Sequence, residues 1–281
     1  MGPEMERDTS PEQAPEPGVR PGAGADELLR HGDMTVLGRI LPASNSTFFC
    51  RLGPEATGVR AVYKPVSGER PLWDFEDGTL ANREYAAWLV SDALGWSVVP
   101  PTVLREGSAG PGMVQVWCEP DPDQAPVDLV PDGPLPAGTL HVLDAFDERD
   151  RPVMLVHEDS SALRRMALFD VVVNNTDRKG GHVLAMHDGH RYGVDHGVCF
   201  HVDDKLRTVL WGWHGDPIAE EDVQALQCLA ERLDADLGDR LADLLTAAEI
   251  RATRRRLARL LSARRFPQPG RGWPSIPWPA F

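Results

Sequence analysis

Short runs of alternating or β-branched apolar residues dominate the first part of the chain. Between the third and fourth runs, Thr79–Leu94 lacks Gly and Pro and carries apolar positions at helical spacing, with Thr79 as the expected N-cap and Gly95 beyond the end. The pattern predicts an antiparallel sheet with one long helix. The expected strands are Met34–Leu41, Thr47–Leu52, Val59–Pro65 and Met113–Trp117.

The second part of the chain has the spacing of helices. Ala167–Val173 is apolar except for Asp170 and is expected to be a core element. Val183–Met186 and His190–Val194 flank the turn signal Asp188-Gly189 and predict a hairpin. Two longer segments have helical composition, Pro217–Leu237 and Asp239–Ala263. The chain is therefore expected to be an α+β protein with a small antiparallel-sheet lobe and a mainly helical large lobe.

The same change of pattern predicts the domain organisation. The start of the chain is rich in Pro, Glu and Gly and is expected to be disordered, and a Pro- and Asp-rich stretch is expected to connect the lobes. The predicted parts are a disordered tail (1–24), an N-lobe (25–118), a linker (119–139), a C-lobe (140–265) and a Pro- and Trp-rich tail (266–281), which folds back through Trp273 and Trp278.

Two acidic loops carry the candidate chemistry. The first, Asn175–His182, contains Asp177, and the second, Val194–Gly197, contains Asp195. They are 18 residues apart, and the predicted hairpin between them would return Asp195 to the side of Asp177. Phosphoryl transfer needs one carboxylate to orient and deprotonate an acceptor hydroxyl and another to hold a divalent ion, and the spacing matches that of the protein-kinase catalytic and metal loops.

Only three lysines occur among the 29 basic residues: Lys64, Lys179 and Lys205. A lysine kept where arginine is otherwise used suggests a site that needs a compact charge. Lys64 ends a predicted strand at a proline, as the phosphate-binding lysine of a kinase does. Lys205 stands in a polar run, where chance is the simpler explanation.

Glu84 is the expected partner of Lys64. It lies on the predicted helix with Leu80, Ala81, Ala87 and Trp88 three and four residues away. A carboxylate on an apolar face is costly to bury unless a cation pairs with it. The alternatives are that Glu84 pairs locally with Arg83 or that it lies at the edge of that face.

A nucleotide would be expected between the lobes. The loop between the first two strands offers Ser44, Asn45 and Ser46 as phosphate contacts, although a plain polar turn explains it equally well because the glycine-rich kinase motif is absent. The backbone near Trp117, Cys118 and Glu119, at the start of the connection, is where adenine would dock.

Five stretches resemble a known family over roughly residues 30–265. The chain is similar to the actinobacterial phosphatidylinositol 3/4-kinase-related proteins, within an atypical kinase group that also includes the HipA-like kinases. The stretches are Val62–Pro65, Glu69–Phe75, Gly78–Glu84, Arg165–His182 and Gly193–Gly197.

This resemblance implies a kinase-like fold and ATP as the phosphate donor. It implies Lys64 for the phosphates, Glu84 for its ion pair, Asp177 as catalytic base, and Asp195 with His182 as metal ligands. Lipid kinases carry Asp-Arg-His-x-x-Asn, whereas here Lys179 replaces the His and His182 replaces the Asn. Imidazole suits Mn²⁺ better than Mg²⁺, so either ion is a candidate.

Two other classes of function stay open. A pseudokinase would bind nucleotide through Lys64 and Asp195 without transfer. A metal-dependent hydrolase would use histidines and aspartates of one short window to activate water, although their spacing follows no known ligand rule. That window holds His182, His187, His190, His196 and His201 together with Asp177, Asp188 and Asp195.

Composition and charge limit the location and the partners that we expect for the protein. No apolar run is long enough to span a bilayer and no signal segment is visible, so a cytoplasmic protein is expected. The four cysteines follow no metal or disulfide spacing. The net charge of −14 argues against nucleic acid as a partner, and the Arg-rich stretch from Glu249 onward is expected to meet protein. The acceptor of a transferred phosphate, whether protein, lipid or small molecule, would meet residues 198–215.

Overall fold

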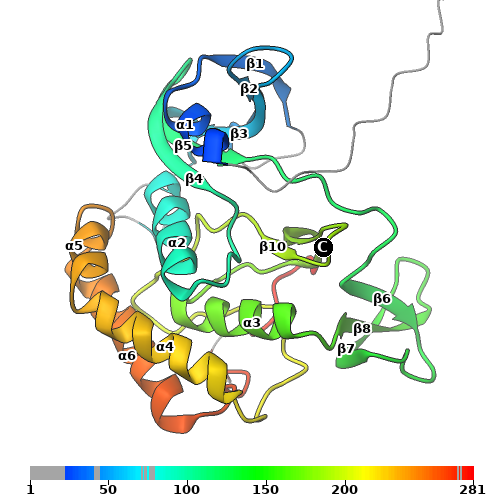
Figure 1. Cartoon of the computed structure of the whole chain (residues 1–281). Coiled ribbons are helices and arrows are strands. Elements are labelled where there is room, and N and C mark those ends of the chain that lie inside the picture. Colours follow the sequence, from blue (N-terminus) through cyan, green and yellow to red (C-terminus); the bar gives the residue numbers. More distant parts are fainter. Residues whose placement is uncertain are drawn as a thin grey trace, which may run out of the picture.

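The computed structural model describes residues 23–40, 45–70, 72, 75, 80–270, 272 and 274–281. The predicted disordered tail lies outside these ranges up to residue 22, and its last two residues begin helix α1 (Ala23–His31). Thr79, the expected N-cap, also lies outside them. Figure 1 shows a small lobe built on a sheet above a larger, mainly helical lobe. The α+β, two-lobed architecture predicted from the sequence is confirmed.

The small lobe is a five-stranded antiparallel sheet in the order β1-β2-β3-β5-β4. Alternation places one set of side chains of β2 and β3 inside, where Cys50, Leu52, Ala61 and Tyr63 pack beneath Leu29 of α1. The strands are β1 (Met34–Arg39), β2 (Phe48–Leu52), β3 (Val59–Pro65), β4 (Thr102–Gly107) and β5 (Gly110–Val116), with a 3₁₀ turn, Val66–Gly68, after β3.

Helix α2 (Leu80–Leu94) follows the sheet in sequence but packs into the core of the large lobe. Ala86, Leu89 and Val90 are fully or almost fully buried there together with residues of α3 and α4. The helix therefore joins the two lobes, with its first turns beside the sheet and the rest held by the large lobe.

A second sheet lies at the side of the large lobe (Figure 1). It contains β6 (Val127–Pro131), β7 (Thr139–Phe146) and β8 (Pro152–Glu158), in the antiparallel order β6-β8-β7. The sequence analysis did not predict these strands, and β6 falls inside the expected linker, because the Pro and Asp residues around it resemble a loop. The connection between the lobes is thus partly sheet.

The large lobe is built from four helices and a small hairpin. Ser160 caps α3 (Ser161–Val173) by accepting a hydrogen bond from the Leu163 amide, and Asn174 ends the helix in the left-handed conformation. The hairpin appears where it was predicted. The remaining elements are the 3₁₀ turn Gly180–His182, β9 (Val183–Ala185), β10 (Arg191–Gly193), α4 (Glu220–Leu233), α5 (Asp236–Ala242) and α6 (Ala247–Ala263).

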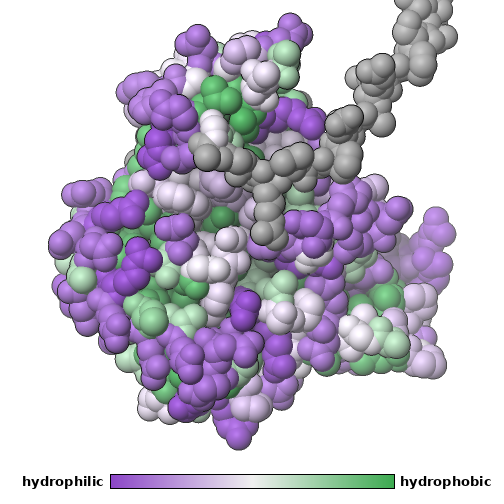
Figure 2. Space-filling model, in the orientation of Figure 1, coloured by the Kyte–Doolittle hydropathy of each residue, from purple (hydrophilic) through white to green (hydrophobic). Residues whose placement is uncertain are grey.

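The segment 239–263, predicted to be helical, is divided between the end of α5 and α6. The chain breaks after α5 because Thr246 and Glu249 form a capping box, in which each side chain satisfies a backbone amide at the start of α6. No helix in the described ranges has the length and apolar character to cross a bilayer. On the face shown in Figure 2, hydrophilic residues cover most of the helical lobe.

The tail after Phe266 does fold back onto the large lobe, but not as predicted. Trp273 lies outside the described residues, and Trp278 is 82% exposed. The contacts come instead from the backbone of Ser275 and Ala280 and from the ring of Phe281.

Candidate active site

Lys64 lies at the centre of the site. It comes from the end of β3, and its Nζ donates to Oε1 of Glu84 and to Oδ1 of Asp195, each at 2.7 Å. The predicted pairing of Lys64 with Glu84 is thus present, and the second acidic loop joins it. Although burial alone would lower it, the carboxylates of Asp195 and Glu84 together raise the pKa of Lys64 above its usual range.

Glu84 is almost completely buried, with 1% of its surface exposed. Its second oxygen, Oε2, accepts a hydrogen bond from the backbone amide of His196 at 2.9 Å. One side chain of α2 therefore holds both the lysine of the small lobe and the turn that carries Asp195. This double role satisfies a carboxylate that would otherwise be costly to bury.

Asp195 sits in a tight turn of the large lobe. Its φ is +63°, a conformation uncommon for residues other than glycine. The positive charge of Lys64 is the main reason that the pKa of Asp195 is lowered. A carboxylate kept ionised in this way is suited to hold a divalent ion as well as an ammonium group.

Asp177 is positioned by the residues just before it. Asn174 ends α3, and Asn175 Oδ1 accepts the Asp177 amide at 3.0 Å while Asn175 Nδ2 donates to Asp170. The Asp177 side chain remains 34% exposed, and Lys179 Nζ is 3.6 Å from its Oδ2. Desolvation raises the pKa of Asp177 despite this neighbouring charge.

Arg178, next to Asp177, is a residue that the sequence analysis missed. An Asp-Arg pair in a polar loop is usually solvated, yet Arg178 is fully buried. Its Nε and Nη2 contact the Asp170 carboxylate at 3.0 and 2.9 Å, and its Nη1 donates to the carbonyls of His182 and Val194. Arg178 therefore ties the loop of Asp177 to the turn of Asp195.

His182 lies between the two aspartates. Its Nδ1 is 3.0 Å from the Asp177 carbonyl oxygen, so Nδ1 carries the proton in the neutral ring and Nε2 keeps a free lone pair. Nε2 is 3.6 Å from Oδ2 of Asp195. Burial lowers the pKa of His182, which favours the neutral form that binds metals.

A divalent ion could be held by two protein ligands here, His182 Nε2 and the Asp195 carboxylate. Within the described ranges, no group of three or more His, Cys, Asp and Glu side chains is placed to hold a metal. Magnesium in phosphotransferases commonly takes one or two carboxylates and completes its shell with phosphate oxygens and water. The donor set fits an ion that binds together with a nucleotide.

A cavity of about 380 Å³ opens beside Lys64 and Asp195. The predicted residues Trp117, Cys118 and Glu119 form one wall of it. Val62, two residues before Lys64 on the same strand face, and Gln115 are lining residues that the sequence analysis missed, although strand alternation gives the position of Val62. The lining is Ile40, Thr47, Val62, Lys64, Gln115, Val116, Trp117, Cys118, Glu119, Pro120, Leu184, Val194 and Asp195.

The predicted phosphate contacts of the first loop are not brought to this cavity. Ser44 lies outside the described residues, and neither Asn45 nor Ser46 is among the lining residues. Asn45 Oδ1 accepts the Arg70 amide at 2.9 Å, and the Ser46 amide donates to the Gly68 carbonyl. These contacts support the plain-turn alternative for both residues.

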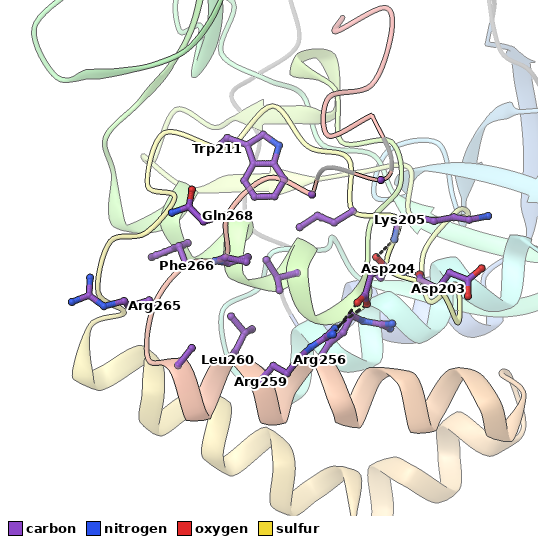
Figure 3. Close-up of a pocket in the computed structure, with 17 residues that line it drawn as sticks. Asp203, Asp204, Lys205, Trp211, Arg256, Arg259, Leu260, Arg265, Phe266 and Gln268 are labelled. Carbon is purple, nitrogen blue, oxygen red and sulfur yellow. Dashed lines mark hydrogen bonds and ion pairs between the residues drawn. The ribbon is translucent and has the colours of Figure 1, made fainter.

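A larger cavity, of about 920 Å³, lies elsewhere in the large lobe between α6, residues 203–206 and the chain after Phe266 (Figure 3). Apolar side chains such as Trp211, Leu260 and Phe266 line it, and Arg259 forms a two-bond ion pair with Asp204 at its edge. Neither Lys64 nor either candidate catalytic aspartate reaches it. We therefore assign the candidate active site to the smaller cavity, because Lys64 and Asp195 line it.

The histidine window does not form a hydrolase centre in the described structure. Its members bind different partners: His187 contacts Asp121, His190 contacts the Ser97 carbonyl, and His196 Nε2 lies 2.6 Å from Arg178. His201 packs against Lys205 and Asp203. Within the described residues, the window therefore supplies no cluster of three or more metal ligands.

Comparison with known proteins identifies a close relative. The chain is 52% identical over 268 residues to Protein Rv2133c of Mycobacterium tuberculosis (strain ATCC 25618 / H37Rv). The aligned region covers 90% of this chain and 94% of that protein. No family model matches the chain. Among solved structures, the Helicobacter pylori proinflammatory kinase CtkA aligns with a TM-score of 0.40 and 12% identity, over 84% of this chain and 94% of that one.

Proposed function

This chain belongs to the family of the mycobacterial Protein Rv2133c, and we propose that it is an ATP-dependent phosphotransferase. One observation carries the proposal: Lys64 bridges Glu84 and Asp195 at the edge of a cavity between the lobes. A strand lysine paired with a helix carboxylate beside a metal-loop aspartate is the constellation that protein kinases use to hold ATP phosphates.

The roles follow from the contacts. Lys64 binds the nucleotide phosphates and Glu84 fixes its position. Asp195 and His182 hold Mg²⁺ or Mn²⁺, which would neutralise charge on the phosphates when bound. The adenine lies against the wall formed by Trp117, Cys118 and Glu119.

Asp177 is the proposed base. It accepts the proton of an acceptor hydroxyl as the acceptor oxygen forms a bond to the γ-phosphorus, and the bond between that phosphorus and the β–γ bridging oxygen breaks to release ADP. Lys179, 3.6 Å from the Asp177 carboxylate, is placed to stabilise negative charge on the transferred group. Arg207 adds positive charge near Asp177.

The acceptor is an alcohol group of a protein, lipid or small molecule. The resemblance to phosphatidylinositol 3/4-kinase-related proteins suggests a lipid. Yet residues 198–215 carry only Lys205 and Arg207 as lysine or arginine side chains. No cluster of the kind that binds a phosphoinositide headgroup is visible there.

The test pairs binding with transfer. Calorimetry of ATP with Mg²⁺ or Mn²⁺ measures nucleotide binding, and radiolabelled γ-phosphate measures transfer to protein and lipid mixtures. Asp177→Asn should keep the ATP affinity and abolish transfer, whereas Asp188→Asn, at the tip of the β9–β10 turn, should change neither. Transfer by Asp177→Asn at the rate of the unaltered protein would rule out the assigned base.

A nucleotide-sensing pseudokinase is the second candidate. The observation that favours it is the presence of His182 where kinases carry asparagine, which leaves a metal site of one carboxylate and one imidazole. A protein that binds ATP but transfers no phosphate with either ion would be assigned to this class.

A further inference from the structure

The segment Ser275–Phe281 lies directly against the two loops that surround Asp177. The Ser275 carbonyl accepts hydrogen bonds from the Thr208 amide at 3.0 Å and from the Trp211 indole Nε1 at 2.8 Å. The Ala280 carbonyl accepts one from the Gly180 amide at 2.7 Å. Figure 1 shows this end of the chain beside β10.

The donors of these bonds are fixed relative to Asp177. Gly180 is three residues after Asp177 in the same loop. Thr208 is bridged to Arg178, because the Val209 amide donates to the Arg178 carbonyl and the Arg178 amide donates to the Arg207 carbonyl. Gly180, Thr208 and Trp211 thus form one surface on which the segment Ser275–Phe281 lies, and we call this surface the acceptor groove.

The contacts that the acceptor groove makes with residues 275–281 are ones that an extended polypeptide can supply. Its donors meet backbone carbonyls five residues apart, which is sequence-independent recognition like strand addition. Pro277, between those two carbonyls, is buried. The Phe281 ring covers Gly180 so closely that a Cβ there would lie 2.3 Å from it. A lipid headgroup or a sugar offers no row of carbonyls at this spacing.

We propose that the acceptor of phosphate is an extended polypeptide bound in the acceptor groove, which residues 275–281 of the chain itself fill until the acceptor displaces them. This inference rests on the proposed phosphotransferase function and adds the substrate class. Recognition is through main-chain carbonyls, with a preference for proline or aromatic side chains where Pro277 and Phe281 now lie.

The test uses variants of the full chain that weaken the contacts of the segment Ser275–Phe281. Phe281→Ala removes the ring over Gly180, and Trp278→Ala is the matched control because Trp278 lies in the same segment but is 82% exposed. Gly180→Ala is a second variant that displaces the ring, with Gly181→Ala as its control because a Cβ at 181 meets nothing within 4 Å. Hydrogen exchange at the Gly180 and Thr208 amides reports release of the segment.

Transfer is measured in parallel to three acceptors: a degenerate peptide mixture containing Ser, Thr and Tyr, phosphatidylcholine vesicles with phosphatidylinositol, and free inositol. We expect Phe281→Ala to raise exchange at both amides by about fivefold, and to raise transfer to peptides to a similar extent. Trp278→Ala should stay within about twofold of the unaltered chain.

The outcomes are distinct. Unchanged exchange in Phe281→Ala and Gly180→Ala, or released segments with transfer to vesicles or inositol but not to peptides, would overturn the polypeptide acceptor and leave the phosphotransferase intact. Absence of both ATP binding and transfer in every variant would instead refute the phosphotransferase itself.

Discussion

Replacing Arg178 by methionine tests whether the two acidic loops depend on one buried cation. The Arg178 and Asp170 side chains are both 0% exposed, and the ion pair between them is made through Nε and Nη2. Methionine fills much of the same volume but offers no donor. The Asp170 carboxylate would keep the Asn175 amide and the Thr208 hydroxyl, at 3.0 and 3.2 Å. The Val194 carbonyl would lose the Arg178 donor, and the His182 carbonyl would keep only the Val194 amide.

The expected cost follows from this burial. Removing one partner of a buried ion pair typically lowers the free energy of unfolding by about 3–5 kcal/mol, because the remaining charge is left uncompensated. Arg259→Met is the matched control, since Arg259 and Asp204 form a two-bond pair whose side chains are 62% and 59% exposed. An exposed pair contributes about 1 kcal/mol or less.

Thermal and urea unfolding measure the difference. At roughly 2 °C per kcal/mol for a chain of this size, Arg178→Met should lower the Tm by about 6–10 °C and Arg259→Met by about 2 °C or less. The double variant Asp170→Asn/Arg178→Met should recover part of the loss because no charge remains buried. A Tm for Arg178→Met equal to that of Arg259→Met would refute the assignment of Arg178 as the tie between the loops.

Three further predictions concern the chemistry of the site. Lys64→Met should remain folded and lower ATP affinity in calorimetry at least tenfold, because it removes the phosphate contact; an unchanged affinity would contradict the nucleotide site. The pKa of Asp177 is raised by desolvation and its active form as a base is the carboxylate, so transfer should fall as the pH drops through a value above the usual 3.8. An acid limb at or below that value in the pH–rate profile would argue against Asp177. His182→Asn should shift the metal preference of ATP binding from Mn²⁺ toward Mg²⁺, since an amide oxygen is the harder donor; an unchanged ratio of the two affinities would remove His182 from the metal site.

Much of the site was predictable because its signals are local. Lys64 ends a strand at a proline, Glu84 lies on an apolar helix face, and each aspartate occupies a loop next to an apolar run. The turn signal Asp188-Gly189 between the two aspartates predicted the hairpin that returns Asp195 to the side of Asp177. These features need only a few neighbouring residues to be recognised.

The missed features depend on partners that are distant in sequence or on weak local patterns. Arg178 is buried because it pairs with Asp170 of the preceding helix, α3, and donates to the Val194 carbonyl at the far end of the hairpin. No local sequence pattern shows that arrangement. Strand β6 is surrounded by residues typical of loops. The break before α6 required recognition that Thr246 caps a helix rather than continuing one. Asn45 was assigned by its position in a loop, whereas the structure directs its side chain to the Arg70 amide.

The anchoring of α2 has a consequence for how such a site can be controlled. In protein kinases, movement of the corresponding helix makes or breaks the lysine–glutamate pair. Here Arg83, beside Glu84, is 1% exposed, lies 2.6 Å from Glu249 of α6 and donates to the Cys199 carbonyl. Displacing α2 would break these bonds and expose Leu89 and Val90 of the core.

Glu84 is therefore fixed in the large lobe, whereas Lys64 can move with the sheet of the small lobe. Tilting the sheet away from the large lobe would separate Lys64 from Glu84 and Asp195 in a single movement. Opening of the cleft and loss of the ion pair would then be one event rather than two. A ligand that bridges the lobes would switch the site by holding the sheet down, without any rearrangement of the helix.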